Sequence, residues 1–249
     1  MMLIKKLDSY LPSTNEKTQQ LLYQLIPQYC VLCHSKLTPQ HKDQLCKVCE
    51  AALPTIDTCC GQCNTPLSTD SELCGVCLKS ERHWDQCYAA YAYQYPISSL
   101  IHQLKYQKKL YLVNIFARLI QNRIISHSTE LPDFFVPVPI HAKRLTERGF
   151  NQSLLLTKKI SQQMGIPWRL PLNKSHHTDS QVYLTRKERQ RQLAHSFEQN
   201  KQITLLELSE KHITIIDDVV TTGTTCTEMA KILKRMGART VDIWCIART

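Results

Sequence analysis

Two adjacent carboxylates and a cluster of small hydroxyl residues are the groups in this sequence best suited to chemistry. Asp217 and Asp218 follow the β-branched apolar run 213–216, which is typical of a buried parallel strand. Strand, turn and helix N-terminus together predict a phosphate site, because free backbone N–H groups and the positive end of the helix dipole converge there. The residues of this predicted phosphate loop are Thr221, Thr222, Gly223, Thr224 and Thr225.

The carboxylates suit another part of the same ligand. Because like charges repel, Asp217 and Asp218 fit a sugar diol or a hydrated divalent cation beside the phosphate, and Gly223 would let the backbone approach the anion closely. Phosphate, ribose and metal together indicate a phosphorylated ribose ligand. The alternative is an ordinary strand-to-helix turn with a solvated acidic pair. No GxxxxGK[ST] or GxGxxG string occurs, and the chain has only 6 glycines, which argues against a nucleotide loop built from glycine.

A second chemical feature is a series of four CxxC pairs between residues 30 and 77. Such spacing indicates zinc, because two knuckles supply a tetrahedral shell of four thiolates. Sequential pairing of the knuckles is favoured, and interleaved pairing stays open, as does a redox role. Cys60 is preferred over Cys59, because only Cys60 keeps the two-residue interval to Cys63. We expect two structural zinc ions on Cys30, Cys33, Cys46, Cys49, Cys60, Cys63, Cys74 and Cys77.

The positive charge of the chain is unevenly placed. Residues 1–90 hold 8 Lys and Arg against 9 Asp and Glu, whereas residues 91–249 hold 23 against 12. The second part is therefore expected to meet a polyanion or a polyphosphate, although a solvated basic surface is the plainer interpretation. The start of the chain has no apolar signal region and no run is long enough to span a membrane, so we expect a cytosolic protein without membrane insertion.

Strands alternating with helices must position these groups. Strand patterns at 87–93, 134–139, 213–216 and 241–247 are separated by helical patterns at 97–105, 110–125, 152–164 and 226–236. This order predicts an α/β fold with a parallel sheet and the phosphate loop at the carboxyl edge, where such folds bind ligands. Arg144 and Arg148 are one helical turn apart and would share one face, a pattern suited to phosphate oxygens or to a basic surface turn.

Five strings in this order are similar to the ComF competence family: the CxxC pairs, LIHQLKY at 100–106, VPVP at 136–139, RGFNQ at 148–152 and DDVVTTG at 217–223. The resemblance implies a type I phosphoribosyltransferase fold behind a zinc domain. It implies a double zinc ribbon-like domain at 29–80 and a phosphoribosyltransferase-like domain at 87–249, and the apolar pattern before them predicts an N-terminal helical segment at 1–28. Lys108 stands where the family commonly has glycine, and Gln192 where it has asparagine.

The resemblance also implies roles. Asp217 and Asp218 would contact ribose hydroxyls and metal as catalytic residues, and the phosphate loop would bind the 5′-phosphate of phosphoribosyl pyrophosphate (PRPP) with Mg²⁺. Residues 136–139 with Arg144 and Arg148 would face the pyrophosphate, and Lys105 is a further PRPP-binding candidate. The flexible loop, which could also bind nucleic acid, would contain Arg186, Lys187, Arg189 and Arg191.

Three functions compete at this point. We favour a competence protein for natural transformation that binds PRPP and handles incoming single-stranded DNA, together with DNA-processing proteins. The alternatives are an active phosphoribosyltransferase on an unidentified acceptor, for which no pocket is apparent in the sequence, and an adaptor that docks proteins through its zinc domain. Stacking of bases on tyrosines would suit the first, although the same rings could be core residues: Tyr88, Tyr91, Tyr93, Tyr95 and Tyr106.

Overall fold

The computed structural model describes residues 28–38, 43–69, 72–79, 82–125, 130–174, 196–200 and 205–249. The chain forms two compact units, Met1–Leu53 and Pro54–Thr249. The predicted N-terminal helical segment lies outside the described residues except for its last position. The boundary between the units falls between the two halves of the cysteine-rich region, whereas the predicted domains follow sequence character, so those borders stay a prediction.

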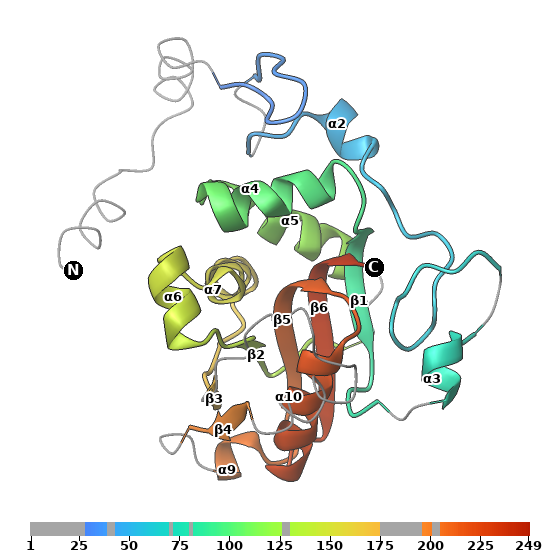
Figure 1. Ribbon diagram of the computed structural model, residues 1–249, viewed down its shortest axis with the longest axis vertical. Coiled ribbons are helices and arrows are strands. Elements are labelled where there is room, and N and C mark those ends of the chain that lie inside the picture. The colour runs from blue at the N-terminus through green and yellow to red at the C-terminus, as the bar shows by residue number, and fades with distance from the viewer. Residues whose placement is uncertain are drawn as a thin grey trace. The chain divides into compact units, whose positions relative to one another are not determined.

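The second unit is built on a four-stranded parallel sheet with the order β1-β6-β5-β2 (Figure 1). The strands are β1 (Cys87–Ala92), β2 (Phe134–Pro137), β5 (His212–Val220) and β6 (Thr240–Arg248). Parallel registers pair Asp217 with Cys245 and Val136 with Ile215. The predicted parallel α/β architecture is confirmed, and β5 and β6 occupy its centre because their side chains are apolar on both faces.

Helices cover both faces of this sheet. They are α4 (Ile97–Gln107), α5 (Leu112–Ile125), α6 (Ala142–Arg148), α7 (Gln152–Met164) and α10 (Thr224–Arg235). One core contains Ile213 and Ile215 of β5 with Met229 and Leu233 of α10. Because side chains alternate along a strand, Ile216 and Trp244 point to the other face. There Trp244 meets the ring of Phe135 at 5.4 Å, and α5 and α7 pack on the strands.

Smaller elements complete the two units. A two-stranded antiparallel sheet joins β3 (Leu172–Lys174) to β4 (Phe197–Gln199), and the short helix α9 (Leu205–Leu208) leads into β5. Each cysteine group carries one short helix, α2 (Lys47–Ala51) in the first unit and α3 (Gly75–Lys79) in the second. Among the helices of the described ranges, none has the length and apolarity needed to cross a membrane.

The ends of β5 and α4 add two details to the elements expected from the sequence. β5 continues to Val220, so the acidic pair lies inside the strand, before its last two residues, and not after it. Lys108 ends α4 in the left-handed region, with φ 54°. A position with positive φ favours glycine, because a Cβ clashes there with the backbone. This conformation suits the glycine that the resemblance implies at this position.

Candidate functional site

The eight predicted ligand cysteines form two groups, each made by sequential knuckles. Cys30, Cys33, Cys46 and Cys49 form one, and Cys60, Cys63, Cys74 and Cys77 the other, with the ligand atoms of each group within 4.8 Å of one another. Four thiolates at this spacing fit the tetrahedral shell of zinc. Cys59 lies outside the second group, and its Sγ accepts a hydrogen bond from Asn64 Nδ2 at 3.1 Å.

The two groups repeat one backbone design at an interval of 30 residues. The N–H of Cys30 donates to Ser35 O at 2.9 Å, and that of Cys60 donates to Thr65 O at 2.9 Å. The turn then passes through His34 in one group and Asn64 in the other, both with positive φ. The CxxC spacing predicts the knuckles but not this repeat of backbone bonds, since the residues around the cysteines differ between the two groups.

The second cysteine group is part of the core beneath the sheet. Cys60 and Cys63 are buried in the same cluster as Trp84, Met229 and Ile243. We call residues 58–79 the second ribbon. Its knuckles therefore pack against the sheet and α10, and loss of its metal would disturb the support of the phosphate loop.

The acidic pair lies at the carboxyl edge of β5 among partners from two helices. Asp218 is 3% exposed and forms an ion pair with Lys105 of α4. Its Oδ1 also accepts a hydrogen bond from Gln152 Nε2 at 3.2 Å. Asp217 Oδ1 accepts from Ser153 Oγ at 2.9 Å and from the N–H of Asp218 at 2.9 Å. The two carboxylates are thus held by different partners and face different groups.

The RGFNQ string explains how α6 and α7 reach this pair. Gly149 ends α6 at φ 85°, and Asn151 caps α7 by accepting from two backbone N–H groups. Asn151 Nδ2 also donates to Val138 O at 3.0 Å, which ties the cap to the loop after β2. Arg148 Nη1 donates to Gln152 Oε1 at 2.6 Å. Gln152 therefore links the predicted phosphate ligand Arg148 to the carboxylate of Asp218.

The two carboxylates have different electrostatic surroundings. Burial, followed by the charge of Asp218, raises the pKa of Asp217 to about 7, and the charge of Lys105 opposes this rise. Lys174 of β3 also lies near: burial and then the charge of Arg144 lower its pKa, while Asp217 raises it. The structure thus brings Arg144 within electrostatic reach of Lys174, and Lys174 within reach of Asp217.

The phosphate loop follows at the N-terminus of α10. Thr222 Oγ1 and Thr224 Oγ1 are 2.8 Å apart, and Thr222 Oγ1 accepts weakly from the N–H of Thr224 at 3.4 Å. Gly223 occupies the cap with φ 74°. A Cβ on Gly223 would lie 2.4 Å from Trp84 Cη2. The packing of Trp84 therefore requires glycine here, a reason that the sequence analysis did not find.

Two arginines hold the backbone of this loop against the second ribbon. Arg248 is 4% exposed; its Nε donates to Cys63 O at 2.9 Å and its Nη1 to Val220 O at 2.8 Å and to Thr221 O. Arg82 Nη1 donates to Thr222 O at 3.1 Å, and its guanidinium lies 4.9 Å from the ring centre of Trp84. Because Arg248 bonds both Cys63 and the loop, the position of the loop depends on the ribbon.

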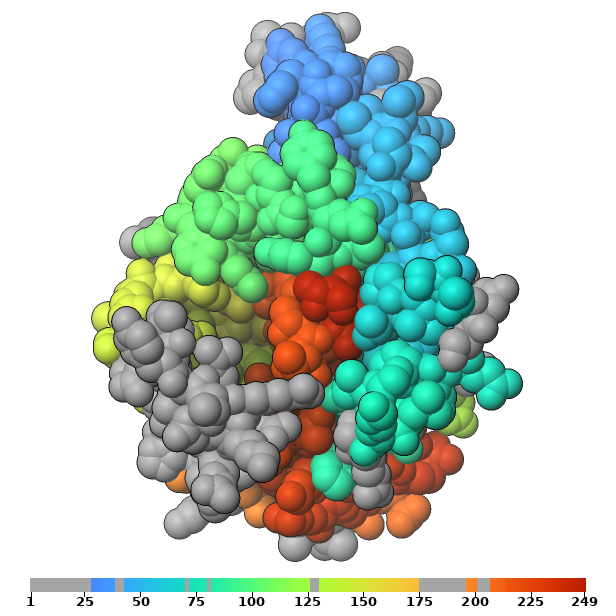
Figure 2. Space-filling model, turned by 45° about the vertical axis from the view of Figure 1, so that its right-hand side comes forward, coloured from blue at the N-terminus to red at the C-terminus, as the bar shows by residue number. Residues whose placement is uncertain are grey.

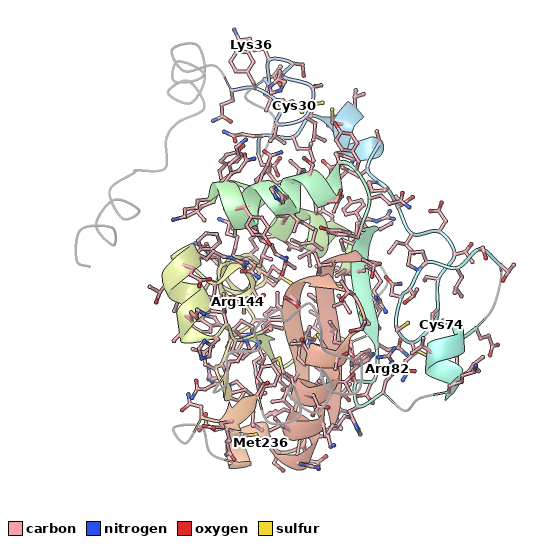
Figure 3. All side chains as sticks on the ribbon, viewed as in Figure 1. Cys30, Lys36, Cys74, Arg82, Arg144 and Met236 are labelled. Carbon is pink, nitrogen blue, oxygen red and sulfur yellow. The ribbon has the colours of Figure 1, made fainter. Side chains whose placement is uncertain are left out.

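The structure brings together most of the predicted site residues. Lys105 and Arg148 reach the acidic pair directly or through Gln152, and Arg144 is near Lys174. Figure 3 shows Arg144 and Arg82 on opposite sides of the β5 and β6 strands, so the cations form two separate groups. The predicted flexible-loop residues Arg186, Lys187, Arg189 and Arg191 lie outside the described residues.

The tyrosines divide between core and surface. Tyr91 is 3% exposed and cannot stack on a base, so that part of the stacking hypothesis is wrong. Tyr95 and Tyr106 are 78% and 65% exposed, and Tyr106 lies 5.7 Å from the Arg148 guanidinium. The sequence did not point to five further residues that contact the site residues or lie near them, because a single residue outside a motif carries little signal; they are Arg82, Trp84, Ser153, Lys174 and Arg248.

Comparison with known proteins adds two family models and several relatives. Residues 21–78 match a double zinc ribbon domain, and residues 151–249 match a phosphoribosyl transferase domain. DNA utilization protein YhgH of Escherichia coli K12 and of Shigella flexneri are each 34% identical over 90% of this chain and 98% of their own. Competence protein F of Haemophilus influenzae is 30% identical over 88% of this chain and 96% of its own. The ribbon match and the two groups of four cysteines support two structural zinc ions.

Proposed function

Since the chain belongs to the family of DNA utilization protein YhgH and competence protein F, we propose that it binds PRPP with Mg²⁺ and handles incoming single-stranded DNA in the cytosol. The family and the phosphoribosyl transferase domain make it a competence-related, phosphoribosyltransferase-like protein. The binding of PRPP, the strand and the cellular location are our proposals. The observation that carries them is the acidic pair beside the N-terminus of α10.

Each part of PRPP has chemically matched groups in this proposal. The 5′-phosphate lies against the hydroxyls and N–H groups of the phosphate loop. The ribose hydroxyls and Mg²⁺ are held by Asp217 and Asp218, whose oxygens suit both. The pyrophosphate faces the cations of the neighbouring group, Arg144 and Lys174. Mg²⁺, when bound, would neutralise charge on the pyrophosphate.

Binding requires a local rearrangement at Asp218. Its ion pair with Lys105 occupies the carboxylate that the ribose or Mg²⁺ would contact. A ligand therefore has to displace the ammonium group, which is then free to contact a phosphate oxygen. Lys105 in this way shields a buried carboxylate while the ligand is absent and contributes to ligand binding afterwards.

Isothermal titration calorimetry with PRPP and Mg²⁺ tests the proposed PRPP binding. The double variant Asp217→Asn, Asp218→Asn should lose PRPP affinity at least 10-fold, because metal and diol both lose charged acceptors. Arg235→Gln, at the far end of α10, is the control and should bind as the wild type does. Equal affinity in the double variant and the wild type would contradict the proposed site.

Strand handling is supported by the charge of residues 91–249 and by the exposed rings of Tyr95 and Tyr106. Oligonucleotide affinity should fall with salt, with a slope of about −0.7 per neutralised phosphate. Charge reversal at Arg186, Arg189 and Arg191 should flatten this slope. Failure to bind an oligonucleotide at low salt would contradict strand handling.

The second candidate is transfer of the phosphoribosyl group to an acceptor. The partly buried carboxyl of Asp217 favours it, because a carboxylate there would stabilise positive charge developing at ribose C1 as pyrophosphate leaves. Release of pyrophosphate from PRPP in the presence of a nucleobase, absent in Asp217→Asn, would identify this activity. If the protein neither binds a strand nor transfers the phosphoribosyl group, the adaptor function remains. Pull-down with the full chain tests it.

A further inference from the structure

A pocket lies between the second ribbon and the phosphate loop, and of its lining residues only Thr221 and Thr222 also belong to the proposed PRPP site. Its volume is about 600 Å³. Figure 2 shows the teal surface of the ribbon directly beside the red and orange surface of the strand ends. Val76, Lys79 and Arg82 line the pocket from one side, and Thr221, Thr222 and Arg248 from the other.

The charges around this pocket point to an anion. Three of the described lining residues are cationic, and none of them is Asp or Glu. Arg82 Nε is buried without a hydrogen-bond partner, an arrangement that costs free energy unless a ligand or water satisfies it. Among the described residues, Arg248 donates hydrogen bonds through Nε and Nη1, which leaves Nη2 for a ligand. These groups suit phosphate oxygens.

The remaining walls suit a base. Gly75 and Val76 of α3 contribute apolar surface, and the volume lies within the range of small-molecule sites. Thr221 and Thr222 belong to both the pocket and the phosphate loop. A ligand here would therefore lie next to the 5′-phosphate position, on the β1 side of the sheet and away from Arg144 (Figure 3).

We propose that this pocket binds a nucleoside phosphate unit of single-stranded nucleic acid, held between the second ribbon and the phosphate loop. The inference rests on the proposed function and deepens it, because it assigns the strand to one surface. It also gives the second ribbon a role in ligand recognition besides its role in supporting the loop. A free nucleotide has the same chemistry, and the experiment separates it from a strand.

Two apolar residues of α3 provide a matched pair of variants. Val76 lines the pocket and Leu78 does not, although they are 43% and 69% exposed. They are about 200° apart around the helix, and both flank the same ligand cysteine, Cys77. Val76→Glu places a carboxylate in the pocket, whereas Leu78→Glu places the same charge outside it. Zinc content and circular dichroism verify that both variants fold.

Fluorescence anisotropy with a labelled 12-nucleotide oligothymidylate measures strand binding in the full chain. Val76→Glu should weaken it at least 10-fold, and Leu78→Glu should remain within about twofold of the wild type. Lys79→Gln should weaken it and make the salt slope shallower by about 0.7, the value for one phosphate contact. Equal affinities in Val76→Glu and Leu78→Glu would overturn the proposal, as would failure of the wild type to bind either oligothymidylate or thymidine monophosphate.

Parallel titrations distinguish a free nucleotide from a strand as the ligand, and they test the pocket separately from the PRPP site. If thymidine monophosphate binds as tightly as the oligonucleotide and with the same sensitivity to Val76→Glu, the site is supported and its ligand is a free nucleotide. PRPP calorimetry on the same proteins tests the proposed function by itself. If the wild type binds PRPP and the pocket variants do not change oligonucleotide affinity, only the pocket proposal is rejected. If the wild type does not bind PRPP, the proposed PRPP site is rejected.

Discussion

Trp84 packs directly against Gly223, so that the indole ring occupies the space in which any other residue would place its Cβ. The ring is 2% exposed and belongs to the core that contains Cys60 and Cys63. A residue just after the second ribbon thus fixes the first turn of α10. The phosphate loop and the ribbon are in this sense one structural element.

Gly223→Ala should destabilise the protein by about 2 kcal/mol or more, because it combines positive φ with a clash in a packed core. Urea unfolding measures the change. The double variant Trp84→Leu, Gly223→Ala should recover the part of the lost unfolding free energy that is due to the clash with the ring. The part that is due to the positive φ should remain. A single Gly223→Ala variant as stable as the wild type would show that the contact with Trp84 is not close in solution.

Removing only one partner of the ion pair between Lys105 and Asp218 should be costly, because the other charge is then buried without a partner. Lys105→Met strands a buried carboxylate and should cost about 3 kcal/mol at pH 8. Lys105→Met, Asp218→Asn removes both charges and should be closer to the wild type in stability. Urea unfolding of the wild type, Lys105→Met, Asp218→Asn and the double variant forms a double-mutant cycle. Additive effects of the two substitutions would contradict a direct ion pair.

Asp217 should make stability depend on pH. Its pKa is raised to about 7 in the folded state, so between about pH 4 and pH 7 the folded state binds a proton that the unfolded state has lost. Stability from this group is therefore greatest at low pH and falls as pH rises toward 7, with a slope of up to about 1.4 kcal/mol per pH unit. Asp217→Asn should abolish this contribution. Identical pH profiles of unfolding in the two proteins would refute the shift.

Loss of metal from the second ribbon should reduce PRPP binding at the phosphate loop more than loss of metal from the first cysteine group. We expect about two zinc ions per chain in the wild type, and about one in either Cys49→Ser or Cys77→Ser. PRPP affinity should fall in Cys77→Ser, because Cys63 O is held by Arg248 together with the loop carbonyls. Cys49→Ser is the matched control. Equal PRPP affinities in these two variants would show that the ribbon does not support the loop.

Lys108→Gly should stabilise the protein by about 1 kcal/mol, because it relieves a left-handed backbone conformation at the end of α4. Lys108→Ala retains a Cβ and should give little of this gain. Thermal or urea unfolding compares the two variants with the wild type. A gain as large in Lys108→Ala would assign the effect to the lysine side chain and not to the backbone.

The sequence by itself determined the features that depend on neighbours along the chain. The CxxC spacing specified the four knuckles, because a knuckle is a local turn, whereas the sequential pairing into two groups of four thiolates came from the structure. The apolar run before Asp217 specified a buried central strand, and α7 runs from Gln152 to Met164, as its periodicity predicted. These patterns carry their information within one turn or one strand.

Only the tertiary structure decided which distant residues meet. Arg248 and Cys63 are 185 residues apart, and Lys105 and Asp218 come from different elements, yet each pair makes a direct contact. The single-residue reason for Gly223 likewise depends on Trp84. The physical reason is that hydrogen bonds and packing act over a few ångströms in space, whereas a sequence pattern reports only the periodicity of its own segment.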